Sequence, residues 1–238
     1  MVRRTRRGAT LPPDKVPRGL HKEYMRMPRI KLPEPEPLSD TLDAVIGKRA
    51  SCRVGSFQET FSIGELGTLL GHALRVRDDG RRNYPSGGAL FPIETYLVGN
   101  VLEGYAPGVF HYHPTAHALE FLWELPPDFD MENVLRSPNP RAPFSSALIV
   151  FTSVWDRASA KYGDFSYIIG LLEAGHMSQN VLLVSASLDL CTCPMAGFND
   201  ELLTNLLDID EGYEQPVHTI TLCRKGASDV DASDGEEA

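Results

Sequence analysis

The sequence predicts an α+β fold that combines helices with antiparallel strands. Two segments with helical spacing come first, and four short runs rich in β-branched and aromatic residues follow them. The longest periodic segment, 164–190, comes next, followed by a short helix and a last strand. This order is typical of α+β proteins and not of a regular βαβ alternation.

Two helices are expected at the start of the domain. In "SDTLDAVIGKRASCR", Ser39 is a plausible N-cap, and the apolar residues that follow recur at helical spacing. In "SIGELGTLLGHALRV", Ser62 and Glu65 form a capping box in front of a continuous apolar face. The capping box predicts that the second helix begins directly after Ser62.

The β-rich runs are each bounded by Gly or Pro turns and cover residues 93–101, 108–113, 118–125 and 147–155. The middle two alternate polar and apolar residues, which predicts a hairpin. The last is apolar over enough consecutive positions to be a strand buried on both faces.

The segment 164–190 is expected to form a helix about 40 Å long. It is apolar on most sides, which predicts burial either in a large core or against a partner subunit. Its small residues would allow close approach of the backbone; they are Gly170, Ala174, Gly175, Ser178, Ser185 and Ser187. After it, Asn199 is expected to cap a short helix, and 216–226 is expected to contain the last strand.

Composition divides the chain into three parts. Residues 1–37, with the proline-spaced "LPEPEP", are expected to be an extended and flexible arm, residues 38–226 the folded domain, and residues 227–238 a disordered acidic tail. The net charge of −9 argues against a nucleic-acid partner. It also means that a bound anion must be held by a local cluster of Lys and Arg.

The sequence gives no sign of a membrane partner. It contains no window of the roughly 18 apolar residues that a transmembrane helix needs. The basic start "MVRRTRRGATLPPDK" has no apolar stretch behind it, so it does not read as a secretory signal. We therefore expect a cytoplasmic protein.

Neither the cysteines nor the histidines suggest a metal site. The four cysteines, Cys52, Cys191, Cys193 and Cys223, lack the spacing of a zinc site, and we expect them to be small buried residues with free thiols. In "HYHPTAH", His111 and His113 would lie on one face of a strand, as a metal would require. No further ligand stands at a telling distance from these histidines or from His117, so we favour a solvated hairpin.

Three separated segments offer positive charge or permissive backbone: "KRASCR" at 48–53, "YPSGGA" at 84–89, and "PMAGFND" at 194–200 together with "CRK" at 223–225. One anionic cofactor could gather them, since guanidinium groups bind phosphate oxygens in pairs and glycine lets a ligand approach the backbone. The alternative is that these are ordinary surface cations and turn glycines.

"SAKYGDFSY" precedes the long helix and contains Lys161 and Tyr162. This pair could transfer a proton, because a Lys of lowered pKa, or a Tyr beside a cation, can act as acid or base. Neighbouring residues on a helix do not face the same way, so both could reach one site only from an irregular backbone. The alternative is a helix end with Tyr162 packed on the core.

These segments, in this order, resemble the SagB-type dehydrogenases of the FMN-dependent nitroreductase superfamily over about residues 39–226. The Pro-Ser-Gly-Gly-Ala stretch at 85–89 and the Glu-Ala-Gly-His-x-x-Gln-Asn stretch at 173–180 are specific for this branch. The resemblance implies a three-layer sandwich, an intertwined homodimer with the long helix at its centre, and FMN in two clefts between the subunits.

The resemblance also implies roles for individual residues. Pro85, Ser86, Gly87 and Gly88 would lie against the flavin of the neighbouring subunit, and the amides of Ala196 and Gly197 would face the flavin N5 and O4 edge. The phosphate and ribityl contacts would come from Arg49, Ser51 and Arg53, with Arg224 or Lys225 completing the phosphate site. Lys161 and Tyr162 match the pair that azoline-oxidising members use for proton transfer.

The implied function is desaturation of a peptide-derived or other natural-product intermediate, for example azoline to azole, with reoxidation of the flavin by oxygen. A biosynthetic partner protein could take part. Two alternatives stay open: an NAD(P)H-dependent nitro or quinone reductase, and a non-catalytic flavoprotein that serves as a scaffold.

Overall fold

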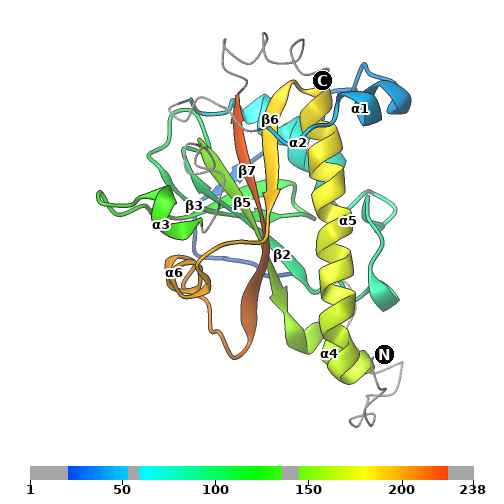
Figure 1. Ribbon diagram of the computed structural model, residues 1–238, viewed down its shortest axis with the longest axis vertical. Coiled ribbons are helices and arrows are strands. Elements are labelled where there is room, and N and C mark those ends of the chain that lie inside the picture. The colour runs from blue at the N-terminus through cyan, green and yellow to red at the C-terminus, as the bar shows by residue number, and fades with distance from the viewer. Residues whose placement is uncertain (1–20, 53–58, 136–144, 225–238) are drawn as a thin grey trace, which may run out of the picture.

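The structure is a computed structural model that describes residues 21–52, 59–135 and 145–224, and Figure 1 shows it as a ribbon. Its centre is a seven-stranded sheet in the order β1-β4-β3-β2-β5-β7-β6, in which every neighbouring pair is antiparallel. The strands are β1 Arg29–Lys31, β2 Ile93–Gly99, β3 Gly108–His113, β4 Ala118–Glu124, β5 Ala147–Val154, β6 Leu190–Met195 and β7 Glu214–Arg224. The expected antiparallel sheet and the β3–β4 hairpin are confirmed.

Helices cover both faces of the sheet, so the molecule has three layers and the predicted α+β class is confirmed (Figure 1). The helices are α1 Leu42–Lys48, α2 Ile63–Leu74, α3 Met131–Val134, α4 Trp155–Tyr162, α5 Ser166–Ser187 and α6 Asp200–Leu206, with short 3-10 turns η1 Gly87–Ala89 and η3 Gly163–Phe165. One core lies between the sheet and the helices α2 and α5, and a second lies between the sheet and the helices α3 and α6. Alternate residues of β5 enter the two cores, so this strand is buried on both faces, as predicted.

Three helix starts show how local sequence sets the elements. The capping box of Ser62 and Glu65 is present at the start of α2, and Asn199 caps α6, both as predicted. The cap of α1 is Thr41, whose hydroxyl accepts a hydrogen bond from the amide of Ala44, so the expectation of Ser39 was wrong. Thr41 stands directly before the first helical residue, where an N-cap must lie.

The long helix α5 has an unusual surface. It spans 22 residues, and its sheet-facing side enters the core. Its outer side carries large apolar residues, of which Tyr167 is 55% and Leu172 is 58% exposed. On the neighbouring helix α1, Leu42 is 68% and Ile46 is 58% exposed.

The packed chain begins before residue 38. β1 pairs with β4, and Lys22 forms a 2.7 Å ion pair with Glu214 of β7. Residues 21–37 therefore belong to the folded unit, which corrects the expected boundary at 38. Residues 1–20 and the acidic tail 227–238 lie outside the described residues.

The expectation of a solvated hairpin around the histidines was wrong. His111 is fully buried, and its two ring nitrogens lie 3.1 Å from Glu94 and 2.8 Å from Glu120 on the neighbouring strands. Arg157 and Arg29 pair with the same carboxylates at 2.5 and 2.6 Å. Burial on its own would raise the pKa of both carboxyls, but hydrogen bonds from His111 and the nearby guanidinium groups hold each pKa at about 2. The histidine therefore belongs to a buried charge network.

Candidate functional site

The glycine pair lies against the Lys161–Tyr162 pair. A Cβ on Gly88 would lie 2.6 Å from the Lys161 Nζ atom and 2.8 Å from the Tyr162 hydroxyl oxygen, and Gly88 has a φ of +68°. Only glycine fits such a backbone so close to two polar side-chain ends. The structure thus brings together two motifs that are more than 70 residues apart in the sequence.

Both polar ends reach this point because the backbone changes direction there. Tyr162, the last residue of α4, has φ −111° and ψ −6°, which depart from the values of a regular helix, and the helix stops at Gly163. The irregular backbone that the sequence required for a shared site is present. The Lys161 ammonium also lies 5.2 Å from the centre of the Tyr162 ring. Tyr162 packs on Leu90 and Ala158, so its ring contributes to a small core while its hydroxyl faces the glycine loop.

The loop in front of the glycines is bonded to α5. The Ser86 hydroxyl accepts a 2.9 Å hydrogen bond from the Phe91 amide and donates to the Glu173 carboxyl. A Cβ on Gly87 would lie 2.5 Å from Ile169, one helical turn before Glu173. Pro85, the first residue of the expected loop, is exposed.

Glu173 is 1% exposed and has an unusual acidity. Burial raises the pKa of its carboxyl to about 7, against the hydrogen bond from Ser86 and the positive charge of Arg82, which both lower it. A carboxyl out of water favours its neutral form, since the charged form loses its hydration. The patterns in the sequence do not mark Glu173 as a site residue; the available signal is that it is the only acidic residue of α5.

The expected phosphate contacts lie at the other end of α5. Arg49 follows the last residue of α1 and is half-buried, and it forms no ion pair with any residue in the described ranges. Ser51 is exposed, and the amide of the next residue, Cys52, donates a 2.8 Å hydrogen bond to the carbonyl of Thr192 on β6. Arg53 and Lys225 lie outside the described residues.

Arg224 is already engaged within the chain. It forms a 2.7 Å ion pair with Glu65 and a 3.4 Å ion pair with Glu59. The positive charge of Arg224 is therefore partly neutralised. The sequence resemblance implies that Arg49 and either Arg224 or Lys225 bind the phosphate. Because Arg224 is paired, binding of the phosphate would depend more on Arg49.

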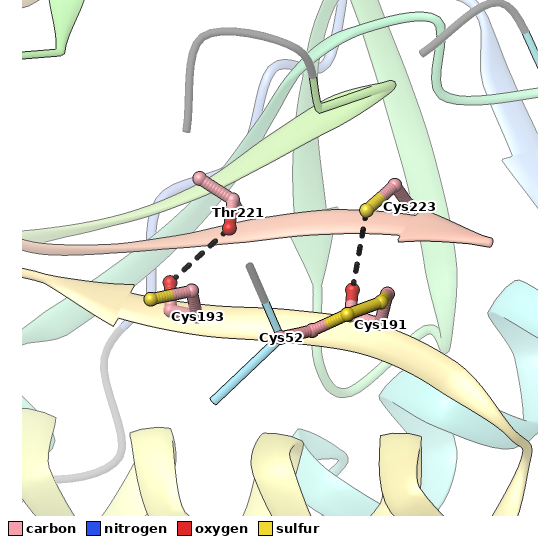
Figure 2. Close-up of a disulfide and its surroundings, with 5 residues drawn as sticks. All are labelled: Cys52, Cys191, Cys193, Thr221 and Cys223. Carbon is pink, nitrogen blue, oxygen red and sulfur yellow. Dashed lines mark hydrogen bonds between the residues drawn. A yellow bond between two sulfur atoms is a disulfide. The ribbon is translucent and has the colours of Figure 1, made fainter. Parts of the chain in front are cut away.

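A disulfide links the segment that follows α1, which contains Arg49 and Ser51, to the sheet. Cys52 is bonded to Cys191 of β6, across a sequence separation of 139, and Figure 2 shows the bond beside Cys193 and Cys223. The expectation that all four cysteines are free thiols was wrong for this pair. The bond and the Cys52–Thr192 hydrogen bond fix the segment of Arg49 and Ser51 next to the strand pair β6–β7.

Ala196 and Gly197 directly follow β6, and both are exposed. Both residues are therefore open to solvent, as contact with a ligand edge requires. Among the described residues, no group of His, Cys, Asp and Glu could hold a metal ion. Likewise, none of the helices that the structure describes has both the length and the apolar character needed to cross a membrane.

The two parts of the site are far apart within one chain. Lys161 and Tyr162 end α4, just before α5 begins, whereas Cys191, bonded to Cys52 next to Ser51, follows the other end of α5 (Figure 1). A 22-residue helix is about 33 Å long. Of the predicted residues that the structure describes, the glycine loop, Lys161 and Tyr162 therefore form one group, and Arg49 and Ser51 form another, with α5 between them.

Comparison with known proteins agrees with the fold. The microcin B17-processing protein McbC of Escherichia coli is 30% identical over 162 residues, which cover 66% of this chain and 60% of McbC. MJ1384 of Methanocaldococcus jannaschii, which carries a nitroreductase name, is 29% identical over 186 residues, covering 76% of this chain and 90% of that protein. The chain thus spans less than two thirds of McbC.

Among solved structures, a chain of the E. coli microcin synthetase McbBCD complex with truncated pro-MccB17 bound is similar, with a TM-score of 0.64 and 28% identity. The match covers 72% of this chain and 67% of that chain. The sequence profile of the nitroreductase family matches residues 46–224, which is most of the chain. This chain therefore belongs to the nitroreductase family.

Proposed function

We propose that the protein is an FMN-dependent dehydrogenase of peptide natural-product maturation that desaturates a peptide-derived ring, for example azoline to azole. The observation that carries the proposal is the convergence of the Lys161 ammonium and the Tyr162 hydroxyl on Gly88. Similarity to McbC, a protein named for processing microcin B17, supports the substrate class. The similar chain in a complex that holds truncated pro-MccB17 supports a peptide as the substrate carrier.

The chain's residues fit FMN in two respects. Arg49 has no ion-pair partner among the described residues, and the exposed Ser51 lies two residues further on, so an anion could bind both. At the other group, Ile169, Lys161 and Tyr162 fill the space beside the two glycines, so a flavin ring would approach the loop from its exposed residues Pro85 and Ala89. Ala196 and Gly197 would add backbone donors at the ring edge.

A second copy of the chain is needed to combine the two groups. The exposed apolar residues of α1 and α5 supply a surface for it; they are Leu42, Ile46, Phe165, Tyr167, Leu171 and Leu172. In a twofold dimer, the Arg49 group of one chain would meet the Gly88 group of the other, which gives two equal sites. The homodimer and its interfacial FMN are thus part of the proposal.

The reaction removes a proton and a hydride from the substrate ring. FMN, when bound, would supply the hydride acceptor, with oxygen as the final electron acceptor. Either Lys161 or Tyr162 takes the proton from the ring carbon, and the other orients it. Lys161 and Tyr162 both lie beside Gly88. The base would therefore face a substrate that binds next to the glycine loop.

The test is the absorption spectrum of the purified protein together with the turnover of two variants. We expect the visible band of oxidised flavin and release of FMN on denaturation. Lys161→Ala and Tyr162→Phe should keep the band and lower turnover by about 10²–10⁴-fold, as loss of a general base does. Loss of flavin together with activity would instead assign the pair a structural role.

One alternative has support of its own, because MJ1384 carries a nitroreductase name and this chain covers 90% of it. In that case NADPH would bleach the flavin rapidly without oxygen, and the azoline substrate would not. A scaffold without catalytic activity would retain pathway output in the Lys161 and Tyr162 variants. A cytoplasmic location and a biosynthetic partner protein remain predictions of the sequence.

A further inference from the structure

The glycine loop adopts a backbone that needs external support. Gly88, Ala89 and Phe91 all have positive φ, at +68°, +56° and +48°. Residues with a side chain rarely adopt this region, and they keep it only where the surroundings impose it. Something around the loop must therefore hold it.

The holding contact comes from Ser86. Its hydroxyl accepts the 2.9 Å hydrogen bond from the Phe91 amide, which closes the loop on itself. The same hydroxyl donates to the Glu173 carboxyl, which fixes its rotamer so that its lone pair faces the amide. The Ser86 hydroxyl is thus already hydrogen-bonded to Glu173 and to the Phe91 amide. The expected contact of Ser86 with a cofactor would compete with these two hydrogen bonds.

The buried carboxyl of Glu173 is placed to hold the Ser86 hydroxyl. Glu173 is 1% exposed, and the Ser86 hydroxyl and the backbone of Ile93, the first residue of β2, both act on its carboxyl and lower its pKa. Burying a carboxyl is costly, so the contacts that it makes here must offset that cost. One turn earlier, Ile169 blocks any side chain on residue 87, so α5 touches the loop at two successive positions.

We propose that Glu173 is a positioning residue that holds the Ser86 hydroxyl and thereby keeps Gly88 beside Lys161 and Tyr162. It acts through Ser86 and does not touch the reacting atoms. Its effect on turnover rests on the proposed function. Its effect on the loop does not, so the two can be tested separately.

The loop is tested by hydrogen exchange of the Phe91 amide in the protein without flavin. Glu173→Met keeps the size of the side chain and removes its acceptor, and Ser86→Ala removes the hydroxyl itself. We expect exchange at Phe91 to become roughly 2- to 10-fold faster in both variants, as loss of one hydrogen bond implies. Glu201→Met, which removes an exposed carboxylate from α6, is the matched control and should leave exchange unchanged.

A conservative substitution at position 173 shows whether Glu173 positions the loop or only contributes to the overall stability of the fold. Glu173→Gln retains a polar side chain that can accept from Ser86, so it should restore both the protection of Phe91 and most of the turnover. In the loaded enzyme, Glu173→Met should lower kcat with little change in KM, because the substrate still binds while the base is misplaced.

Unchanged Phe91 exchange in Glu173→Met, with faster exchange in Ser86→Ala, would overturn the proposal. If Glu173→Met does not fold, the comparison of Glu173→Gln with Ser86→Ala decides: equal loss of protection in both would contradict the positioning role. If the chain binds no FMN, the proposed function is wrong, but the exchange of the Phe91 amide still tests whether Glu173 positions the loop.

Discussion

Lys161 and Tyr162 are adjacent in the sequence, and yet their polar ends lie within 2.6 and 2.8 Å of the same point, the place that a Cβ on residue 88 would occupy. A regular helix would direct the two side chains to different sides. The backbone of Tyr162, with φ −111° and ψ −6° at the end of α4, departs from the regular helix where the two side chains converge. This relationship gives the first prediction.

Gly88→Ala should remove most activity, because the new methyl group would displace the Lys161 ammonium and the Tyr162 hydroxyl. Gly80→Ala is the matched control: Gly80 has a similar φ of +76°, but a Cβ there would meet nothing within 4 Å. Both variants should lose about 1 kcal/mol of unfolding free energy from the left-handed backbone. Urea unfolding and turnover measure the two effects. Equal turnover in the two variants would show that the reaction does not depend on the close approach of Lys161 and Tyr162 to Gly88.

Arg49→Ala should weaken FMN binding by roughly 10- to 100-fold, the cost of one hydrogen-bonded charge. Arg81→Ala is the control, because the Arg81 side chain is 78% exposed and Arg81 is not among the predicted FMN contacts. Titration of the flavin-free protein, followed by flavin fluorescence, gives both dissociation constants. Unaltered affinity in Arg49→Ala would remove this residue from the phosphate site.

The acidity of Glu173 predicts how stability depends on pH. The pKa of its carboxyl is about 7 in the folded chain and 4.5 in the unfolded one, so the stability linked to its proton is full below pH 4.5 and is lost as pH rises through 7. From about pH 5 to about pH 8, the wild-type unfolding free energy should fall by roughly 3 kcal/mol relative to that of Glu173→Gln. Urea unfolding at several pH values measures this difference. Parallel curves for the two proteins would contradict a neutral Glu173.

The Cys52–Cys191 bond predicts two fewer reactive thiols without reductant. Under denaturing conditions, a thiol reagent should label Cys193 and Cys223 only, and all four cysteines after reduction. Because the bond closes a long loop, its reduction should lower the unfolding free energy by roughly 2–4 kcal/mol. Cys52→Ser should show the same loss in the absence of reductant. Labelling of four thiols before reduction would contradict the bond.

Much of the fold could be predicted because periodicity and turn residues are local signals. The capping box of Ser62 placed α2, and the alternation and length of the β runs placed β2 to β5. β1 has only three residues and β6 contains Pro194, so neither has a clear strand pattern. The cap of α1 was misplaced by two residues because Ser39 and Thr41 both carry suitable hydroxyl groups.

Contacts between distant segments could not be predicted from local patterns. His111 is buried because Glu94 and Glu120 face it from neighbouring strands, and only the strand order creates that arrangement. The Cys52–Cys191 pair depends in the same way on the packing of the loop after α1 on β6. The candidate site was found through the family resemblance of its segments, which named both groups but did not show that α5 separates them.

The central claim is that each site combines Arg49 of one chain with Lys161 of the other, and mixed dimers test it most directly. Arg49→Ala and Lys161→Ala chains are co-expressed, purified together and assayed at an FMN concentration that saturates the wild type but not Arg49→Ala, so that each variant alone turns over slowly. If the site is shared between chains, each mixed dimer has one intact site, and the mixture should recover roughly a quarter of wild-type turnover. If both residues serve the same site within one chain, every site in the mixture keeps one defect, and no recovery above the separate variants would contradict the account.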